Sequence, residues 1–359
     1  MTPETNNQID PLDAADVGDT NIAEFAKPRP EGAISVDHLI ERIKKFGGGK
    51  KFGWKLLDNR GVEVTPGDLA LVAGRTGHGK TTVLFNLLIH WLDAHPGETF
   101  VFFSYEIPPE AVLLKMLSAL TRHYGKSGGW SYNEVRKWMQ RGDGQAPEGL
   151  DVNDLRDALH TLQQWEERLI VIYRPDWNVE ELCQHAIRLS ATVDKLGAIL
   201  VDYLQIVPPP PGEHDGREVE VAIIARRLKR LAVKLDCPVI AAAQFSREAV
   251  QYGDWVPDGT LEDEKVLKAI AKRRPQLHHL NGGAGEQEAD LVVGLLNYQA
   301  DYLAACEDAG LTQLARQETG NAGLFEIAII KNRHGELGLA PLILEARTGY
   351  IRETGAFGR

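Results

Sequence analysis

The stretch GRTGHGKTT at residues 74–82 constrains the fold more than any other part of the sequence. It has the spacing G-x-x-x-x-G-K-S/T, in which glycines let backbone N–H groups approach phosphate oxygens and a lysine reaches the terminal phosphates. An apolar run, LALVAG, leads into it, and a helical apolar pattern, TTVLFNLLIHWL, follows it. The order strand, loop and helix predicts a phosphate-binding loop in an α/β fold.

All residues of this loop are predicted nucleotide contacts. The predicted set is Gly74, Arg75, Thr76, Gly77, His78, Gly79, Lys80, Thr81 and Thr82. Within it, Lys80 is expected to reach the β- and γ-phosphates, and the Thr81 hydroxyl is expected to be a ligand of Mg²⁺.

Apolar runs of strand length alternate with helical patterns along the rest of the chain. The runs are LALVAG, TFVFFSYE, LIVIY, LGAILVDYLQI, CPVIAAAQ, DLVVGLL and FEIAIIKNR. This alternation predicts an α/β core with a mostly parallel, twisted sheet flanked by helices. The polar, Trp-rich segment 121–165 is expected to form helices that cover the sheet.

The N-terminal region differs in composition from this core. Residues 1–34 are acidic and lack periodicity, which predicts a disordered tail. Residues 35–49 predict a linker, because SVDHLIERIKKF has helical apolar spacing and glycines end it. Residues 50–359 then form the core domain.

Bulk properties limit the class of protein. No run approaches 18 apolar residues and the N-terminus lacks a signal-peptide pattern, so we expect a cytoplasmic protein with no membrane partner. Cys183, Cys237 and Cys306 are too few and too dispersed for a disulfide framework or a cysteine zinc site. A net charge of −11 disfavours nonspecific attraction to nucleic acid, although segments 226–234 and 265–274 are locally basic.

Two carboxylates follow predicted strands at the edge where parallel sheets bind ligands. Glu106 can deprotonate an attacking water, or it can be a solvated acid that opens the next helix. Asp202 ends a purely apolar run, where a buried acid needs a cation such as Mg²⁺; the alternative is a turn at the strand end. Because Tyr203 and not Glu follows Asp202, its strand supplies no base, which favours Glu106.

Three further polar residues end predicted strands. Gln244 can sense a γ-phosphate through a hydrogen bond, or it can be a simple loop amide. Lys331 and Arg333 are two residues apart and therefore on one face of a strand, where they can stabilise a transferring phosphate. Alternatively they protect the edge of a sheet from aggregation.

Taken in order, these segments resemble the ATPase domain of DnaB-type replicative helicases, a branch of the RecA-like fold. The matching segments are PGDLALVAGRTGHGKTT, VFFSYEI, AILVDYLQIV, REVEVAIIARRLKRLAVKLDCPVIAAAQFSRE, GEQEADLVVGLL and IAIIKNRHGELG, over about residues 50–353. The strand-end DYLQ and the closing K-x-R-x-G are more specific than the phosphate loop, and they largely exclude kinases and small GTPase switches.

The resemblance implies a RecA-like P-loop ATPase that uses ATP and Mg²⁺ and forms a homohexameric ring with ATP between neighbours. It implies Glu106 as catalytic base, Gln244 as sensor, and Lys331 with Arg333 reaching the adjacent subunit's nucleotide. Loops lining the ring are then expected to hold single-stranded DNA.

The sequence both matches and departs from the family's DNA loops. Arg217 fits the loop before the long helix, whereas LNGGAGEQEAD has Asn281 and glycines where those helicases usually have an Arg, an acid and small residues. Backbone amides around Gly282, Gly283 and Gly285 are expected to hold DNA phosphates instead.

A second departure concerns the N-terminus. Family members at bacterial replication forks carry a helical N-terminal domain that contacts primase, whereas this chain has an acidic tail and a short helix. The helix is expected to dock on a neighbouring subunit, and the tail to contact a replication or loader protein. The leading hypothesis is an ATP-dependent helicase or translocase on single-stranded DNA; the alternatives are a DNA-assembly ATPase that recruits partners without unwinding and a regulatory ATPase that does not bind DNA.

Overall fold

A computed structural model of the chain describes residues 40, 48–142, 144–212, 216–245, 255–280, 284–311 and 323–354. The chain divides into two units, residues 1–48 and 49–359. The predicted acidic tail, and the predicted linker helix apart from Ile40, lie outside the described residues. The boundaries predicted for tail, linker and core therefore stay predictions.

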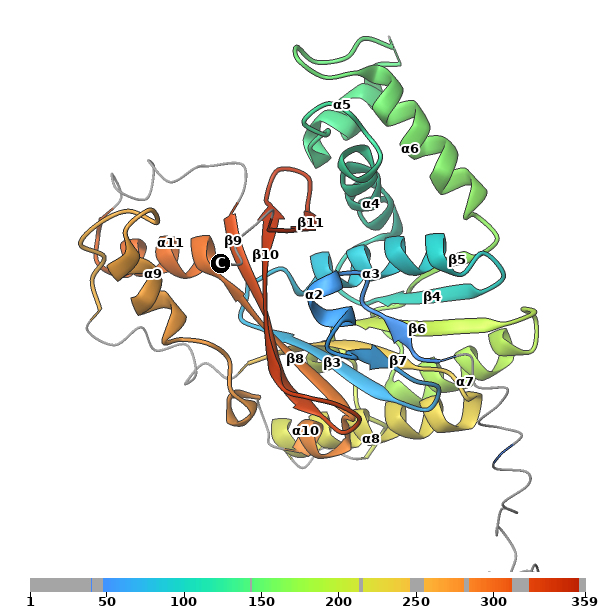
Figure 1. Cartoon of the computed structure of the whole chain (residues 1–359). Helices are drawn as coiled ribbons and strands as arrows, with labels where there is room; N and C mark the ends of the chain where they lie inside the picture. The colour runs from blue at the N-terminus through green and yellow to red at the C-terminus, as the bar shows by residue number, and fades with distance from the viewer. Residues whose placement is uncertain are drawn as a thin grey trace, which may run out of the picture. The chain divides into compact units, whose positions relative to one another are not determined.

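A nine-stranded sheet forms the centre of the second unit, in the order β11-β10-β9-β8-β3-β7-β6-β4-β5 (Figure 1). Six neighbouring strands are parallel, as the alternating pattern predicts. They are β8 (Leu291–Asn297), β3 (Leu69–Gly74), β7 (Val239–Gln244), β6 (Leu196–Asp202), β4 (Thr99–Ser104) and β5 (Leu169–Tyr173). The mostly parallel sheet of the expected fold class is confirmed.

Antiparallel strands complete the sheet at one side. They are β9 (Gly323–Asn332), β10 (Gly338–Glu345) and β11 (Tyr350–Glu353), each antiparallel to the strand before it in the sheet. A separate pair joins β1 (Lys50–Lys51) to β2 (Glu63–Val64). The sequence predicted β9 but not β10 or β11, because β10 contains Pro341 and is only partly buried.

All seven predicted strands are present, but several were predicted too long, and the largest error is in β6. β6 ends at Asp202, and Leu204–Ile206 form the 3₁₀ helix η2. Leu204 is buried in the core beside α8, so its apolar character reflects packing of a turn and not a continued strand.

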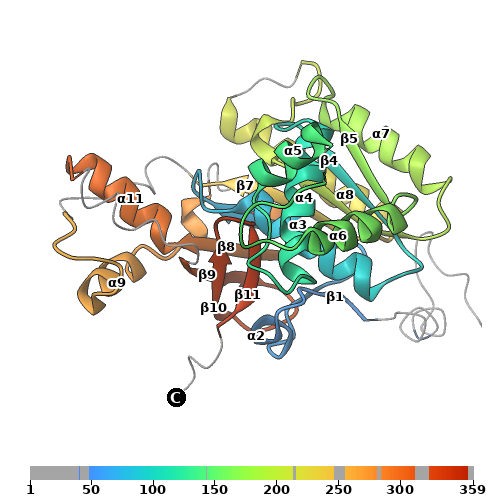
Figure 2. The same cartoon turned by 90° about the horizontal axis from the view of Figure 1, so that it is seen from above.

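Helices cover both faces of the sheet (Figures 1 and 2). One face carries α2 (Lys55–Asp58), α3 (Lys80–Ala94), α4 (Pro109–His123), α5 (Tyr132–Arg141) and α6 (Val152–Gln164); the other carries α7 (Val179–Ser190), α8 (Arg217–Leu235) and α10 (Ala284–Glu288). The alternation of β3 explains the two cores, since Ala70 and Val72 face α3 while Leu69 and Leu71 face α8. The helices expected within residues 121–165 are α5, α6 and the end of α4.

A smaller lobe lies beside the antiparallel strands. It contains α9 (Glu264–Ala271) and α11 (Tyr298–Asp308), and Figures 1 and 2 show α9 next to α11. A third apolar cluster, which includes Val266, Ile270 and Tyr302, joins these two helices. The 3₁₀ helix η4 (Leu277–His279) packs instead against the core on the α8 side of the main sheet. Among the described residues, no helix combines the length and apolar character needed to cross a membrane.

Candidate nucleotide site at the carboxyl edge of the sheet

The carboxyl ends of four parallel strands bring the predicted site residues to one edge. Gly74 at the end of β3 pairs with Gln244 at the end of β7, and Ser104 at the end of β4 pairs with Asp202 at the end of β6. Glu106 follows two residues after Ser104. These strand ends therefore lie at one edge, as the predicted parallel sheet requires.

The phosphate loop requires its glycines at particular positions. Gly77 and Gly79 have φ values of 79° and 82°, a region that side chains rarely adopt. A Cβ at Gly74 would lie 3.3 Å from both Leu295 Cβ and Lys80 Cγ. Because Gly79 has no side chain to cap α3, the first-turn N–H groups of this helix are available to an anion.

Lys80 lies inside the curve of this loop. Its Nζ donates to the carbonyl oxygens of Gly74 at 3.2 Å and Arg75 at 3.0 Å. Burial lowers the pKa of Lys80, and the charges of Asp202 and Glu106 oppose this shift. The ammonium group is thus held by backbone carbonyls at the position where phosphates would enter.

Thr81 and Asp202 form the predicted metal-ligand pair. The Thr81 hydroxyl donates to Asp202 Oδ2 at 2.8 Å, while Asp202 Oδ1 is buried and has no hydrogen-bond partner. Burial raises the pKa of Asp202 to about 6, opposed mainly by the Thr81 hydrogen bond. An orphaned buried carboxylate oxygen beside a hydroxyl is the hard oxygen donor set that Mg²⁺ prefers, so these residues fit that ion.

Glu106 is exposed at the mouth of this site. Its charge acts on the pKa values of both Lys80 and Asp202, and the Tyr105 N–H next to it donates to the Asp202 carbonyl at 3.0 Å. The acid in the first turn of the following helix α4 is Glu110. Glu106 precedes that helix, and its role as base stays a prediction.

Gln244 contacts the phosphate loop directly. Its Nε2 donates to Thr76 Oγ1 at 2.8 Å, so it is not an isolated loop amide. Gln205 of η2, which the sequence analysis missed, holds Gln244 in place: its Oε1 accepts from Gln244 N at 2.9 Å, and its Nε2 donates to Gln244 O at 3.0 Å. The signal was present, because Gln205 is the last residue of the DYLQ motif.

A cavity of about 130 Å³ adjoins the start of α3. Thr82 of the predicted set lines it, together with Lys115, Tyr132 and the β10–β11 turn at Arg347 and Gly349. Asn86 of α3 fixes this turn by donating to Gly349 O at 2.8 Å and accepting from Ile351 N at 2.9 Å. The sequence analysis did not predict this turn, because it did not predict β10 and β11 on either side of it.

Arg75 and His78 direct their side chains into the protein. Arg75 forms two bonds to Asp301 of α11, and His78 Nε2 lies 3.1 Å from Asp301 Oδ1. Both side chains are buried, so only their backbone groups can contact a phosphate. Asp301 has no recognisable sequence signal, and the sequence analysis missed it.

Lys331 and Arg333 lie at the opposite edge of the sheet. Because β9 runs antiparallel to β8, its last residue pairs with Leu291 at the start of β8. Lys331 donates to the carbonyl of Glu286, and Arg333 Nη1 lies 2.8 Å from Asp290 Oδ1. This placement rules out contact with the chain's own phosphate loop. The edge-protection alternative is wrong, since β9 lies between β8 and β10.

Asp290 is paired with several groups at this opposite edge, the amino edge, where the parallel strands begin. Its Oδ2 accepts from Lys229 Nζ at 2.6 Å and from Leu69 N at 2.9 Å. Asp290, Asp68 and His334 bring possible metal ligands within 4.8 Å of one another. Lys229 and Arg333 already neutralise Asp290, however, so electrostatics disfavour a cation here.

The predicted DNA-binding residues are only partly described. Arg217 begins α8, is more than half exposed, and donates to the carbonyl of Gln205. Gly285 lies in α10, where a Cβ would meet Val221 of α8 at 3.6 Å. Asn281, Gly282 and Gly283 lie outside the described residues.

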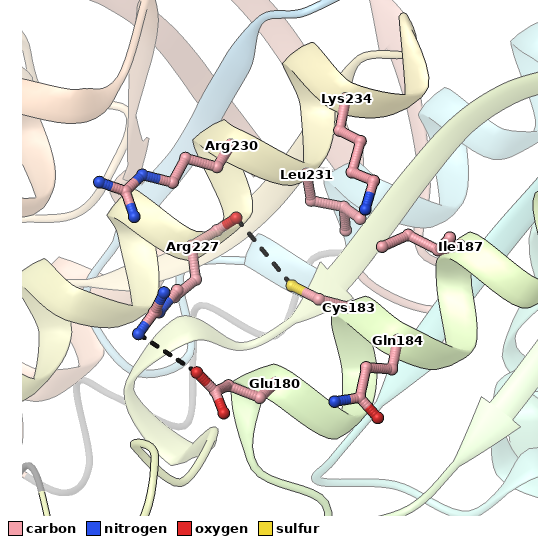
Figure 3. Close-up of a pocket in the computed structure, with 8 residues that line it drawn as sticks. All are labelled: Glu180, Cys183, Gln184, Ile187, Arg227, Arg230, Leu231 and Lys234. Atoms are coloured by element: carbon pink, nitrogen blue, oxygen red, sulfur yellow. Dashed lines mark hydrogen bonds and ion pairs between the residues drawn. The ribbon is translucent and has the colours of Figure 1, made fainter.

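A second cavity, of about 280 Å³, lies between α7 and α8 on the face of the sheet opposite α3 (Figure 3). Four residues of the basic segment 226–234 line it, namely Arg227, Arg230, Leu231 and Lys234. Arg227 pairs with Glu180 at 3.2 Å, whereas Arg230 and Lys234 have no ion-pair partner among the described residues. Burial raises the pKa of Cys183 to about 12, so this thiol stays protonated.

The fold and the carboxyl-edge site define a P-loop nucleotide-binding protein of the α/β class. Residues 49–263 match the family model of the DnaB-like helicase C-terminal domain, and the chain belongs to this family. The chain is 28% identical over 305 residues to the replicative DNA helicase DnaB of Pasteurella multocida, covering 83% of this chain and 57% of that protein. It is 27% identical over 311 residues to the Haemophilus influenzae protein of the same name, covering 86% of this chain and 56% of that protein.

Solved structures agree on the fold. One described as an ATPase domain superimposes with a TM-score of 0.66 at 20% identity, covering 90% of this chain and all of that chain. A DnaB-like replicative helicase, studied with its interactions with primase, gives a TM-score of 0.64 at 20% identity over 90% of this chain and 68% of that chain. This chain spans a little more than half the length of the Pasteurella and Haemophilus relatives.

Proposed function

We propose that this chain is an ATP-dependent helicase or translocase that acts on single-stranded DNA in replication, as a homohexameric ring. Family membership supports the class of activity. The observation that carries the proposal is a chain of contacts from Arg217, at the predicted DNA loop, through Gln205 and Gln244 to Thr76 in the phosphate loop.

The chemistry assigned to the carboxyl edge is hydrolysis of ATP. Lys80 would leave the carbonyls of the loop to bind the terminal phosphates, and Thr81 with Asp202 would hold Mg²⁺. When bound, Mg²⁺ neutralises charge on the phosphates. Glu106 orients the attacking water and accepts its proton. The remaining cations come from Lys331 and Arg333 of a neighbouring subunit, because this chain's own pair lies at the other edge.

The coupling of hydrolysis to DNA runs through Gln244. Its side chain donates to Thr76 of the phosphate loop. Loss of the γ-phosphate from this loop would therefore change the groups to which Gln244 can hydrogen-bond. Gln205 holds the backbone of Gln244 with two hydrogen bonds and also accepts from Arg217. A shift of β7 therefore moves the start of α8, where Arg217 is placed to bind a DNA phosphate.

The proposal extends to partners outside the described chain. The loop with Asn281, Gly282, Gly283 and Gly285 contributes backbone amides to DNA, and the linker helix docks on a neighbour. The acidic tail contacts a replication or loader protein. These assignments rest on the sequence and on the family, since the relatives carry the name of replicative helicases.

Strand displacement on a forked DNA duplex tests the activity. With ATP and Mg²⁺, the wild-type chain should release the labelled strand, and Asp202→Asn should release none because its metal site lacks a carboxylate. ATPase stimulated by single strands without displacement would support the DNA-assembly ATPase instead. ATPase that single strands leave unchanged would support a regulatory ATPase.

A further inference from the structure

Asp301 of α11 binds two residues of the phosphate loop at once. Its carboxylate accepts both Arg75 Nη1 contacts, at 2.8 and 2.7 Å, and lies 3.1 Å from His78 Nε2. All three side chains are buried, and Asp301 is 0% exposed. The loop that would cradle a nucleotide is therefore attached to a residue far away in the sequence.

The rest of the small lobe reinforces this attachment. Arg75 Nη2 donates to the carbonyl of Arg273, just after α9, at 3.2 Å. The N–H of Asn297, which caps α11, lies 3.3 Å from His78 Nδ1. Arg75 and His78 thus anchor the loop to both ends of the lobe, near α9 and at the start of α11.

We propose that Asp301 is a positioning residue, which holds the phosphate loop in its nucleotide-binding conformation and makes nucleotide affinity depend on its own contacts with Arg75 and His78. The inference rests on the proposed nucleotide site. Asp301 itself touches no nucleotide, since it acts through Arg75 and His78. Movement of α11 against α9 would shift both anchors and with them the backbone that surrounds Lys80.

Removal of the Asp301 charge should weaken binding more than it slows chemistry. Without the Asp301 charge, the Arg75 guanidinium fixes the loop less firmly, and the bound conformation becomes one of several. Lys80, Thr81 and Glu106 stay intact, so a saturated site still reacts. In Asp301→Asn we expect the Kd for ATP to rise about tenfold, within the range typical of coupling between sites, while kcat stays within about threefold.

A matched control separates positioning from stability. Glu326 forms a similar two-bond pair with Arg274, at 2.6 and 2.9 Å, and joins the end of α9 to β9 without touching the phosphate loop. Glu326→Gln should lower the melting temperature as Asp301→Asn does, but leave the Kd for ATP unchanged. An equal rise of Kd in both variants would overturn the proposal.

The test uses titration of the full chain with a fluorescent ATP analogue, together with steady-state ATPase and thermal melts. Arg75→Lys, which keeps the charge but loses the two-bond geometry, should raise Kd about threefold and provides a milder variant if Asp301→Asn does not fold. Arg75→Met combined with Asp301→Asn should bind no more weakly than the weaker single variant, because both act through one contact.

The outcomes distinguish the two proposals. Wild-type chain that binds no ATP analogue would refute the proposed nucleotide site itself. Wild-type binding with an unchanged Kd in both Asp301→Asn and Arg75→Lys would refute only the positioning role. A raised Kd in these two variants, with an unchanged Kd in Glu326→Gln, is the result expected.

Discussion

The charged residues at the two edges of the parallel sheet differ in how completely they are paired within the chain. At the carboxyl edge, one oxygen of buried Asp202 lacks a hydrogen-bond partner among the described residues, and Lys80 donates to two backbone carbonyls without an ion pair to any described carboxylate. At the amino edge, Asp290 is neutralised by Lys229 and Arg333 together. Since buried charges are stable only when paired, the first edge is built to receive a charged ligand and the second is complete within the chain.

This difference bears on the proposed contribution of Arg333 to a neighbouring subunit's nucleotide. To act on a neighbour's nucleotide, Arg333 must give up Asp290, but Lys229 then still neutralises that carboxylate. Arg333 is nearly half exposed, whereas Lys229 is mostly buried. Arg333 can therefore leave Asp290 without leaving this buried carboxylate unpaired.

The largest effect is expected from removing Lys80 at the carboxyl edge, and removing Lys331 at the amino edge is the comparison. Lys80→Ala removes the ammonium that binds the terminal phosphates, so ATP binding should weaken about 10- to 100-fold, given about 1.5–3 kcal/mol for a charge-assisted hydrogen bond. Turnover should become undetectable. Lys331→Ala at the amino edge should bind ATP as wild type does. Calorimetric titration of both variants checks the contrast, which fails if both lose ATP equally.

Arg333→Ala should bind ATP almost normally but hydrolyse it about 10³-fold more slowly, because a finger supplied to a neighbour stabilises only transition-state charge. Mixed with wild-type chain it should reduce the rate more than dilution does. Mixed with Lys80→Ala it should regain some activity, since one subunit then supplies the loop and the other the finger. ATPase rate against mixing ratio, with subunit exchange confirmed, is the measurement.

Lys229→Met removes the other cation that pairs with Asp290 and is the companion variant. It should lower stability at least as much as Arg333→Ala, and it should also slow hydrolysis, because Asp290 then has Arg333 as its remaining cation and holds it back from a neighbouring subunit. Strictly additive rates in the mixtures would place Arg333 outside any shared site. They would also remove the main argument for a ring.

The carboxyl edge could be predicted from the sequence because each of its residues follows its own apolar strand directly. Gly74, Asp202 and Gln244 are each the last residue of a strand, and in a parallel sheet such ends meet. Local pattern alone was therefore enough to assemble these side chains.

The contacts that hold this edge in place could not be predicted in the same way. Asp301 is 226 residues from Arg75, and only the packing of α11 brings the two together. The β10–β11 turn lies between strands interrupted by proline and polar residues. Both features depend on tertiary structure, which leaves no periodic signal in the sequence.

A third test concerns Glu106, which belongs to the carboxyl edge but is exposed. Glu106→Gln should retain ATP and hydrolyse it more slowly, on the order of 10²-fold or more, since the amide cannot accept a proton from water. Glu110→Gln, in the first turn of α4, should keep a rate close to wild type. Filter binding and single-turnover assays separate the two steps. A normal rate in Glu106→Gln would require another acid as the base.

The smallest expected effect is on the affinity for DNA, through Arg217 at the start of α8. Binding should favour single strands, depend little on sequence and weaken with salt, because its contacts are with phosphates. Arg217→Ala should reduce affinity a few-fold and lower the slope of log affinity against log salt by about 0.7, the value for one lost contact on a single strand.

Arg230→Ala is the control for this last experiment. Arg230 is also an exposed cation of α8, but it lines the cavity beside α7 (Figure 3). Unlike Arg217, it does not bond to Gln205 in the part of the chain that the structure describes. Its loss should leave the salt slope unchanged, because the proposed DNA contact of Arg217 depends on its link to Gln205 and not on charge alone. Fluorescence anisotropy at several salt concentrations, with single and double strands, measures both. Equal slopes for the two variants would refute the role of Arg217, and equal or absent binding of both DNA forms by the wild type would favour a regulatory ATPase.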